Sequence, residues 1–183
     1  MHVATLGIDL AKQVFQLHGE DVRGHAVLSR RVKRSQLVAA VASLPPCVIG
    51  MEACASAHHW GRAFEPFGHT VKLMSPQYVK PYVKTNKNDC RDAEAICEAV
   101  SRPTMRFVAI KTVDQADLQA VHRSRTLLIK TRTALINQIR GLLAEYGLVI
   151  AQSPEKVRPA LVRFLDDAES GLTAFARETF SED

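Results

Sequence analysis

The chain has 183 residues, of which 46% are hydrophobic and 23% charged, enough for one ordinary domain with a helical extension and too rich in apolar residues for a disordered or collagenous protein. No stretch reaches the roughly 20 apolar residues of a membrane span, and the N-terminus lacks a secretory signal, so we expect a cytoplasmic protein with no membrane partner. Lys and Arg number 24 against 19 Asp and Glu, a net charge of +5, which favours a polyanionic partner.

The first half of the chain alternates strand and helix signals. Three short β-rich runs follow one another at 3–9, 14–18 and 24–29 and predict an antiparallel meander. A helix, a buried strand, a second helix and a further strand are then expected in the order 36–44, 47–51, 56–64 and 70–74. This order predicts an α/β fold with a mixed sheet.

The second half is mainly helical. After a loop with two prolines, helical spacing covers 89–102, a short extended segment is expected at 107–110, and the strongest helix signal runs over 113–146. Two further helices are expected at 154–166 and 172–180. We therefore divide the chain into a first domain at 1–112 and a long helix with a helical tail at 113–183.

The long helix has an apolar seam with 3,4 spacing. Arginines interrupt the seam at two positions, Arg125 and Arg132. The seam is compatible with an intermolecular coiled coil that makes a homo-oligomer, and equally with a helix that folds back on the two helices that follow it. Its apolar members are Leu118, Val121, Leu128, Leu135, Ile139 and Leu142.

The four cysteines have neither the spacing nor the neighbouring histidines of a zinc finger, so we expect reduced thiols. They are Cys47, Cys54, Cys90 and Cys97.

Two acidic residues stand at the ends of predicted strands. Asp9 ends the first strand and Glu52 follows the fourth. A meander followed by a crossover helix favours placing these two strands side by side, which brings the carboxylates together. Like charges at that separation need a shared proton or a divalent cation. The alternative is that each residue only forms a turn or caps a helix.

Two more acids, Asp89 and Asp92, lie three residues apart at the start of a predicted helix and therefore share one face. Acids at this position also serve as N-cap and first-turn residues. The adjacent cations Lys87 and Arg91 fit a second function, in which the acids hold Mg²⁺ and the cations hold phosphate.

These residues resemble a known family. Gly7-Ile8-Asp9, Glu52 at a strand end, and Lys87-x-Asp89-x-x-Asp92 are similar to the DEDD tetrad of bacterial insertion-sequence transposases and invertases. The N-terminal domain of that family resembles the Holliday-junction resolvase RuvC. Residues of the tail are similar to the family's long basic helix, namely Arg123, Arg125, Asn137, Arg140, Leu143 and Gly147.

The resemblance implies an RNase H-like, RuvC-like domain with a five-stranded mixed sheet. It also implies that Asp9, Glu52, Asp89 and Asp92 are the catalytic residues and hold Mg²⁺ or Mn²⁺, with two ions when substrate is bound. The complete protein of this family is a recombinase that excises and inserts an insertion element in DNA, in several members guided by a structured RNA. Its covalent nucleophile is a serine in a C-terminal domain that this chain does not contain, so we expect the chain to be one part of such a protein.

Cations outside the tetrad are expected to hold the nucleic-acid backbone. Those near the acids are Lys12, Lys84, Lys87 and Arg91, and those on the long helix are Arg123, Arg125, Lys130, Arg132 and Arg140. No acid lies between Asp117 and Glu145 to balance the second group. Two alternatives remain open, a freestanding RuvC-like junction endonuclease and a non-enzymatic nucleic-acid-binding dimerisation module.

Overall fold

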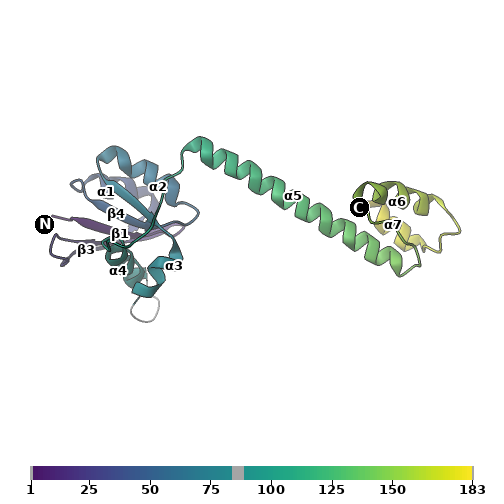
Figure 1. Ribbon diagram of the computed structural model, residues 1–183, viewed down its shortest axis with the longest axis horizontal. Helices are drawn as coiled ribbons and strands as arrows, with labels where there is room; N and C mark the ends of the chain where they lie inside the picture. Colours follow the sequence, from purple (N-terminus) through teal and green to yellow (C-terminus); the bar gives the residue numbers. More distant parts are fainter. Residues whose placement is uncertain (1, 84–88, 183) are drawn as a thin grey trace. The chain divides into compact units, whose positions relative to one another are not determined.

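The computed structural model describes residues 2–83 and 89–182, and of Asp89 and Glu182 it describes the backbone only. The chain forms two compact units, Met1–Ala116 and Asp117–Asp183. Figure 1 shows the sheet and its helices in the first unit and helices alone in the second.

The first unit is built on a mixed sheet whose strand order is β3-β2-β1-β4-β5-β6. β1 is antiparallel to β2 and parallel to β4, and β5 continues the parallel part. This confirms the predicted mixed α/β sheet, with a sixth strand among the described residues because the 107–110 segment returns antiparallel to β5. The strands are β1 Thr5–Asp9, β2 Val14–Glu20, β3 Ala26–Lys33, β4 Val48–Glu52, β5 Thr70–Met74 and β6 Phe107–Val108.

β3 begins and ends later than the sequence indicated. The turn before it takes up residues 21–25: the Asp21 carboxylate accepts the backbone N–H groups of Arg23 and His25, and Gly24 adopts a φ of +79°. The hydrogen bond from His25 lowers the pKa of Asp21. The strand then continues past the predicted end at residue 29 to Lys33, so it includes the cations Arg30, Arg31 and Lys33.

One face of the sheet packs on α1 (Leu37–Ala42) and α2 (Ala57–Phe64). Side chains alternate along a strand, so every second residue points to this face. Ile8 and Met51 are fully buried there, and Phe15 packs edge-on against Trp60 with ring centroids 5.3 Å apart. This face contains the main apolar core of the unit.

The opposite face is covered by α4 (Asp89–Val100). α4 approaches so closely that a Cβ on Gly7 would lie 2.2 Å from the carbonyl oxygen of Ala93. A Cβ on Gly50 would lie 2.9 Å from Cβ of Val100. The two glycines therefore allow α4 to lie directly on β1 and β4. The short α3 (Pro76–Val79) and the 3-10 segments complete the unit: η1 Arg34–Gln36, η2 Glu65–Phe67 and η3 Lys80–Tyr82.

The second unit combines the end of α5 (Val113–Ala144) with η4 (Pro154–Lys156), α6 (Val157–Asp166) and α7 (Ala174–Glu182). Its core contains residues from all three α-helices, among them Ile139, Leu143, Val157 and Phe180. Gly147, at a φ of +71°, ends the long helix, and the N–H of Leu148 donates to the carbonyl of Leu143.

α5 meets the fold-back expectation in part, and the coiled coil stays a prediction. Its last turns fold into the local core, as the fold-back alternative predicted, whereas the apolar residues of its middle stay exposed. Leu118, Val121 and Leu128 are 60–69% exposed. None of the helices in the described ranges is both long and apolar enough to cross a membrane.

Candidate active site

Asp9 and Glu52 meet at one edge of the sheet. In the parallel pairing of β1 with β4, Gly7 lies opposite Gly50 and Ile8 opposite Met51, so Asp9 and Glu52 are the next pair along. Alternation places the two carboxylates on the same face as the glycines, which is the face that α4 covers. Their Cα atoms are therefore separated by about one inter-strand spacing, roughly 4.8 Å.

α4 directs its first turn toward the same edge. The thiol of Cys97 donates to the carbonyl of Thr5 at 3.6 Å, and Ala93 lies against Gly7. Earlier residues of α4 therefore lie nearer the carboxyl end of β1.

Asp92 and Asp89 both lie in this first turn. Ile96 lies against Gly50, and Asp92 precedes Ile96 by one turn, so Asp92 is placed toward the end of β4 where Glu52 lies. Asp89 begins the helix, one turn before Ala93.

Two further polar residues stand in line with the carboxylates. In the antiparallel pairings Asp9 lies opposite Gln16 on β2, and Gln16 lies opposite Arg31 on β3. Arg31, Gln16, Asp9 and Glu52 thus form one row across four neighbouring strands. We call these four residues the polar row.

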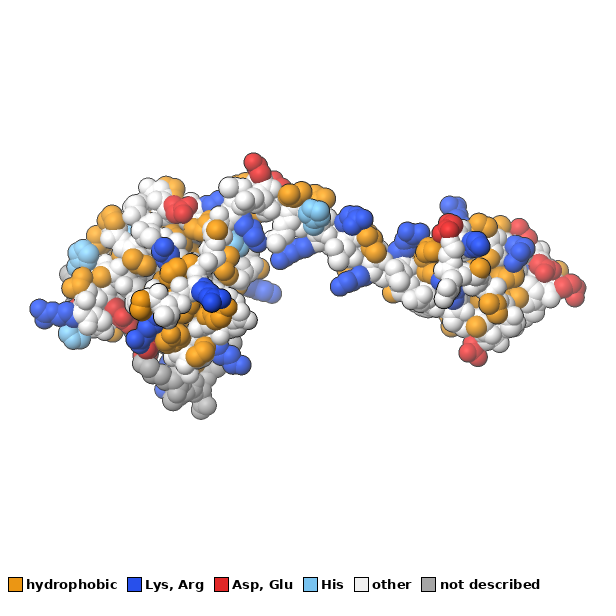
Figure 2. Space-filling model, in the orientation of Figure 1, with side chains coloured by type: hydrophobic (Ala, Val, Ile, Leu, Met, Phe, Trp, Pro, Cys, Tyr) orange, Lys and Arg blue, Asp and Glu red, His pale blue; other side chains and the backbone are white. Residues whose placement is uncertain are grey.

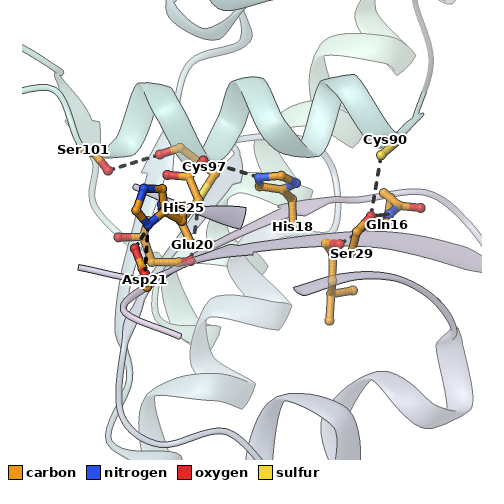
Figure 3. A network of polar contacts seen from close by, with 11 residues as sticks. Gln16, His18, Glu20, Asp21, His25, Ser29, Cys90, Cys97 and Ser101 are labelled. Atoms are coloured by element: carbon orange, nitrogen blue, oxygen red, sulfur yellow. Dashed lines mark hydrogen bonds and ion pairs between the residues drawn. The ribbon is translucent and has the colours of Figure 1, made fainter. Parts of the chain in front are cut away.

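Gln16 is held beneath the start of α4. It is only 6% exposed, and its Nε2 donates to the hydroxyl of Ser29 and to the carbonyl of Leu17, both at 3.3 Å. The Ser29 hydroxyl in turn lies 3.6 Å from the thiol of Cys90, the second residue of α4. Figure 3 shows Gln16, Ser29 and Cys90 together at this end of the helix, with Ser101 at the other.

Sequence analysis missed Gln16 and Arg31 because neither lies in an acidic motif. The register of the β1–β2 hairpin would have identified Gln16. The numbers of paired residues on these strands add up to 25, so residue 9 pairs with residue 16. Hairpin register would have found Arg31 only if β3 had been extended beyond residue 29.

The candidate donors Asp9, Glu52, Asp89 and Asp92 are all carboxylates, which fits a hard divalent cation. Within the described residues, no group of three or more His, Cys, Asp or Glu side chains is close enough to hold a metal ion. The side chain of Asp89 is not described, and Lys84 and Lys87 also lie outside the described residues. Asp9 and Glu52 each have an interaction partner in the structure.

The predicted cations differ in how they are placed. Lys12 is exposed in the loop after β1, where its carbonyl accepts Nη1 of Arg34 at 3.2 Å, and Arg91 is exposed in the first turn of α4. Arg123, Arg125, Lys130 and Arg132 are all exposed on α5. Figure 2 shows blue side chains gathered along the middle of this helix.

Arg140 is placed differently from the other cations of α5. Its Nη2 donates to the carbonyls of Ala151 and Ser153, at 2.6 and 3.2 Å. It therefore ties the loop after α5 to the helix.

The four cysteines are not joined in disulfides in the structure. Burial raises the pKa of Cys47 to about 11 and that of Cys97 to about 12. The N–H of Cys47 also donates to Nδ1 of the buried His69, whose Nε2 lies 3.2 Å from the carbonyl of Val41. These two thiols are neutral packing groups, not nucleophiles.

Comparison with protein families gives a match over most of the chain. Residues 6–148 match the model DEDD_Tnp_IS110, which is described as "Transposase". This range contains the polar row, α4 and all of α5.

Several curated proteins are similar to the chain. A "Transposase for insertion sequence element IS1111A" of Coxiella burnetii is 53% identical over 171 residues, which is 93% of this chain and 47% of that protein. A "Probable family 20 transposase" of Pseudomonas aeruginosa is 51% identical over 162 residues, 88% of this chain and 48% of that protein. A "Transposase for insertion sequence element IS1328" of Yersinia enterocolitica is 44% identical, over 90% of this chain and 53% of that protein. The chain thus spans about half the length of these relatives.

A solved structure, described as "T. thermophilus RuvC in complex with Holliday junction substrate", aligns with 58% of this chain and all of its own. The TM-score is 0.44 and the sequence identity 14%.

Proposed function

This chain belongs to the IS110 family of DEDD transposases, and we propose that it supplies the metal-dependent core with which such a protein cuts and exchanges DNA strands when an insertion element moves. The observation that carries the proposal is the register of β1 and β4. It sets Asp9 beside Glu52 on the face where α4 begins. Two carboxylates lie at the ends of adjacent strands, and the covering helix has acids in its first turn. This arrangement fits metal-dependent phosphodiester chemistry better than it fits a helix-capping role for the acids.

In this proposal Asp9, Glu52, Asp89 and Asp92 hold Mg²⁺ or Mn²⁺, with two ions when substrate is bound. Ions bound there would supply positive charge to neutralise the phosphate and the oxygens that attack and leave. The pairing of β1 with β4 determines the distance between Asp9 and Glu52. The first turn of α4 contributes Asp89 and Asp92.

Nucleic acid is the proposed partner of the exposed cations on α5. Arg123, Arg125, Lys130 and Arg132 stand on a helix without acids from 118 to 144, and such a surface holds DNA or a structured guide RNA through phosphates. The exposed apolar residues Leu118, Val121 and Leu128 on the same helix support a homo-oligomer formed through it.

Complete strand exchange is proposed to need a serine nucleophile in a C-terminal domain, as the family resemblance implies. The relatives are about twice as long as the aligned part, which leaves room for such a domain in proteins of this kind. The residues described above are expected to bind metal and nucleic acid, and strand exchange is expected to need the serine in addition.

The metal proposal is tested by Mn²⁺ titration calorimetry of the full 183-residue chain, alone and with a four-way DNA junction. Asp9→Asn and Glu52→Gln are each expected to weaken Mn²⁺ binding at least tenfold, because each removes a ligand charge. Asp166→Asn, which neutralises an exposed acid of the second unit, is the matched control. Equal Mn²⁺ binding by Asp9→Asn and Asp166→Asn would contradict the proposed site.

The nucleic-acid proposal is tested by the salt dependence of binding to the same junction. Each of Arg123→Ala and Arg125→Ala should lower the slope of log K against log salt by about 0.9, because each removes one phosphate contact.

Arg140→Ala provides the contrast. Because Arg140 bonds to backbone carbonyls of its own unit, it should change the slope less and lower the stability of that unit by about 1–3 kcal/mol. If the salt slopes of the Arg123 and Arg125 variants equal that of the wild type, α5 is not part of the nucleic-acid interface.

A further inference from the structure

The edge strand β3 has three exposed cations in four residues, Arg30, Arg31 and Lys33, with a buried Val32 between them. Alternation divides them between the two faces of the sheet. Arg31, paired with Gln16, lies on the α4 face, and Lys33, paired with Val14, lies on the same face. Arg30, paired with Leu17, lies on the face of α1 and α2.

Arg31 is close to the carboxylate pair. It belongs to the polar row, two strands away from Asp9, which is about 10 Å at the usual inter-strand spacing of roughly 4.8 Å. Three nucleotides of a duplex rise about 10 Å at 3.4 Å each. A strand whose phosphate lies at Asp9 and Glu52 therefore places a further phosphate near Arg31, only a few nucleotides away.

The chemistry of this edge matches a phosphate chain. Arginine presents a planar fork of donors that fits phosphate oxygens in pairs, and lysine adds a point charge. Lys33 follows Arg31 along the same face at about 7 Å, two residues of roughly 3.4 Å each. Lys12, exposed after β1, lies at the same end of the sheet, since β2 begins at Val14 opposite Lys33.

We propose that Arg31 and Lys33 bind backbone phosphates of the nucleic-acid strand that enters the carboxylate site, and that Arg31 is a positioning residue for that strand. The inference rests on the proposed function, because the direction of the strand is set by the carboxylates. It adds a contact surface on β3, separate from the basic middle of α5.

The test is fluorescence anisotropy of a labelled four-way DNA junction with the full chain, at several salt concentrations and without divalent metal. Arg31→Ala is expected to weaken binding about tenfold, the usual scale for one charge-assisted hydrogen-bonded contact, and to lower the salt slope by about 0.9. Arg31→Lys should restore the slope and only part of the affinity, because it keeps the charge and loses the fork.

Arg30→Ala is the matched control. It removes the same charge from the same strand on the other face, so it should weaken binding less than about threefold. Both variants should stay within about 1 kcal/mol of the wild type in thermal unfolding, because both side chains are exposed and an interaction such as the one Arg31 makes contributes little at the surface. Equal weakening by Arg30→Ala and Arg31→Ala overturns the inference, because the cations then act only as general charge at a sheet edge.

Mn²⁺ titration separates this inference from the proposed function. Normal Mn²⁺ binding together with equal effects of the Arg30 and Arg31 variants overturns the β3 contact and leaves the proposed function intact. A selective effect of Arg31→Ala in a chain that binds no Mn²⁺ supports the β3 contact while the metal proposal fails. A wild-type chain that binds neither the junction nor Mn²⁺ overturns both.

Discussion

The two faces of the sheet in the first unit are made from alternate residues of the same strands, yet they differ in kind. The face toward α1 and α2 contains large apolar side chains, such as Ile8, Phe15 and Met51, all fully buried. The face toward α4 contains Gly7 and Gly50 where the helix touches the strands, the polar row at one end, and a smaller apolar cluster that includes Met74, Ile96 and Val100. One face supplies most of the burial, and the other leaves space and polar groups for a ligand.

This difference separates stability from chemistry at the level of single residues. Ile8 and Asp9 are neighbours in the chain and point to opposite faces. A substitution on the face toward α1 and α2 should therefore lower the free energy of unfolding. A substitution in the polar row should weaken the binding of Mn²⁺ or of nucleic acid.

The strongest test of the comparison is Gly7→Ala. The new Cβ would lie 2.2 Å from the carbonyl oxygen of Ala93 and 2.8 Å from the nitrogen of Cys97, both backbone atoms. α4 has to move away, so we expect a loss of more than about 3 kcal/mol, beyond ordinary overpacking, and loss of Mn²⁺ binding. Urea unfolding followed by fluorescence of Trp60, which is buried in this unit, measures it.

Gly141→Ala is the control for that substitution. Gly141 lies in α5, and an added Cβ would meet no atom within 4 Å beyond its chain neighbours and the adjacent backbone of its own helix, so alanine should stabilise the helix by about 0.5–1 kcal/mol. A Gly7→Ala chain as stable as the wild type would mean that α4 does not approach β1 closely.

The adjacent pair Ile8→Ala and Asp9→Asn tests the division directly. Ile8→Ala should lower the free energy of unfolding by about 3 kcal/mol, because it empties a fully buried site, while Mn²⁺ binding by the folded chain is retained. Asp9→Asn should change stability by less than about 1 kcal/mol and weaken Mn²⁺ binding at least tenfold. Urea unfolding and calorimetry on both variants check this. The comparison is wrong if Asp9→Asn is the more destabilising of the two.

The pH dependence of the free energy of unfolding above pH 8 tests the burial of one thiol on each side of the sheet. Cys47 belongs to the α1–α2 core, and Cys97 lies on α4 against β1. Burial raises the pKa of Cys47 from 9.0 to about 11 and that of Cys97 to about 12. The unfolded chain releases these protons first, so stability is full below pH 9 and falls as the pH rises through the folded values. Each thiol should contribute a slope of up to about 1.4 kcal/mol per pH unit.

Urea unfolding at pH 8, 9 and 10 measures this slope. Cys47→Ala and Cys97→Ala should each flatten it, whatever they do to the stability at pH 8. A slope that neither substitution changes would assign the alkaline sensitivity to other groups.

The smallest expected effect is that of Gln16→Leu. Leucine removes two hydrogen bonds of 3.3 Å and adds apolar burial, so the free energy of unfolding should change by less than about 1 kcal/mol. Urea unfolding measures the change. A loss above about 2 kcal/mol would show that the polar row stabilises the fold, which would weaken the contrast between the faces.

Much of the fold could be predicted from the sequence because it depends on local signals. The strand at Thr70–Met74 and the start of α4 at Asp89 were placed correctly, since turn residues and helical spacing mark them. Asp9 and Glu52 could be identified as a candidate pair because each acid directly ends an apolar run.

The rest of the site depends on contacts between distant segments, which sequence patterns do not record. Gln16 and Arg31 join the polar row only through strand register, and β6 exists only because its segment returns beside β5.

The sequence by itself therefore determined the order of the elements, the charge of α5 and the identity of the acids, because alternation, helical spacing and composition act over a few residues. Only the tertiary structure decided which neighbours these acids have, that Gly7 and Gly50 admit α4, and that Arg140 holds a loop while Arg123 stays exposed. Those outcomes follow from pairing and close packing across the chain, where the energy depends on which surfaces meet.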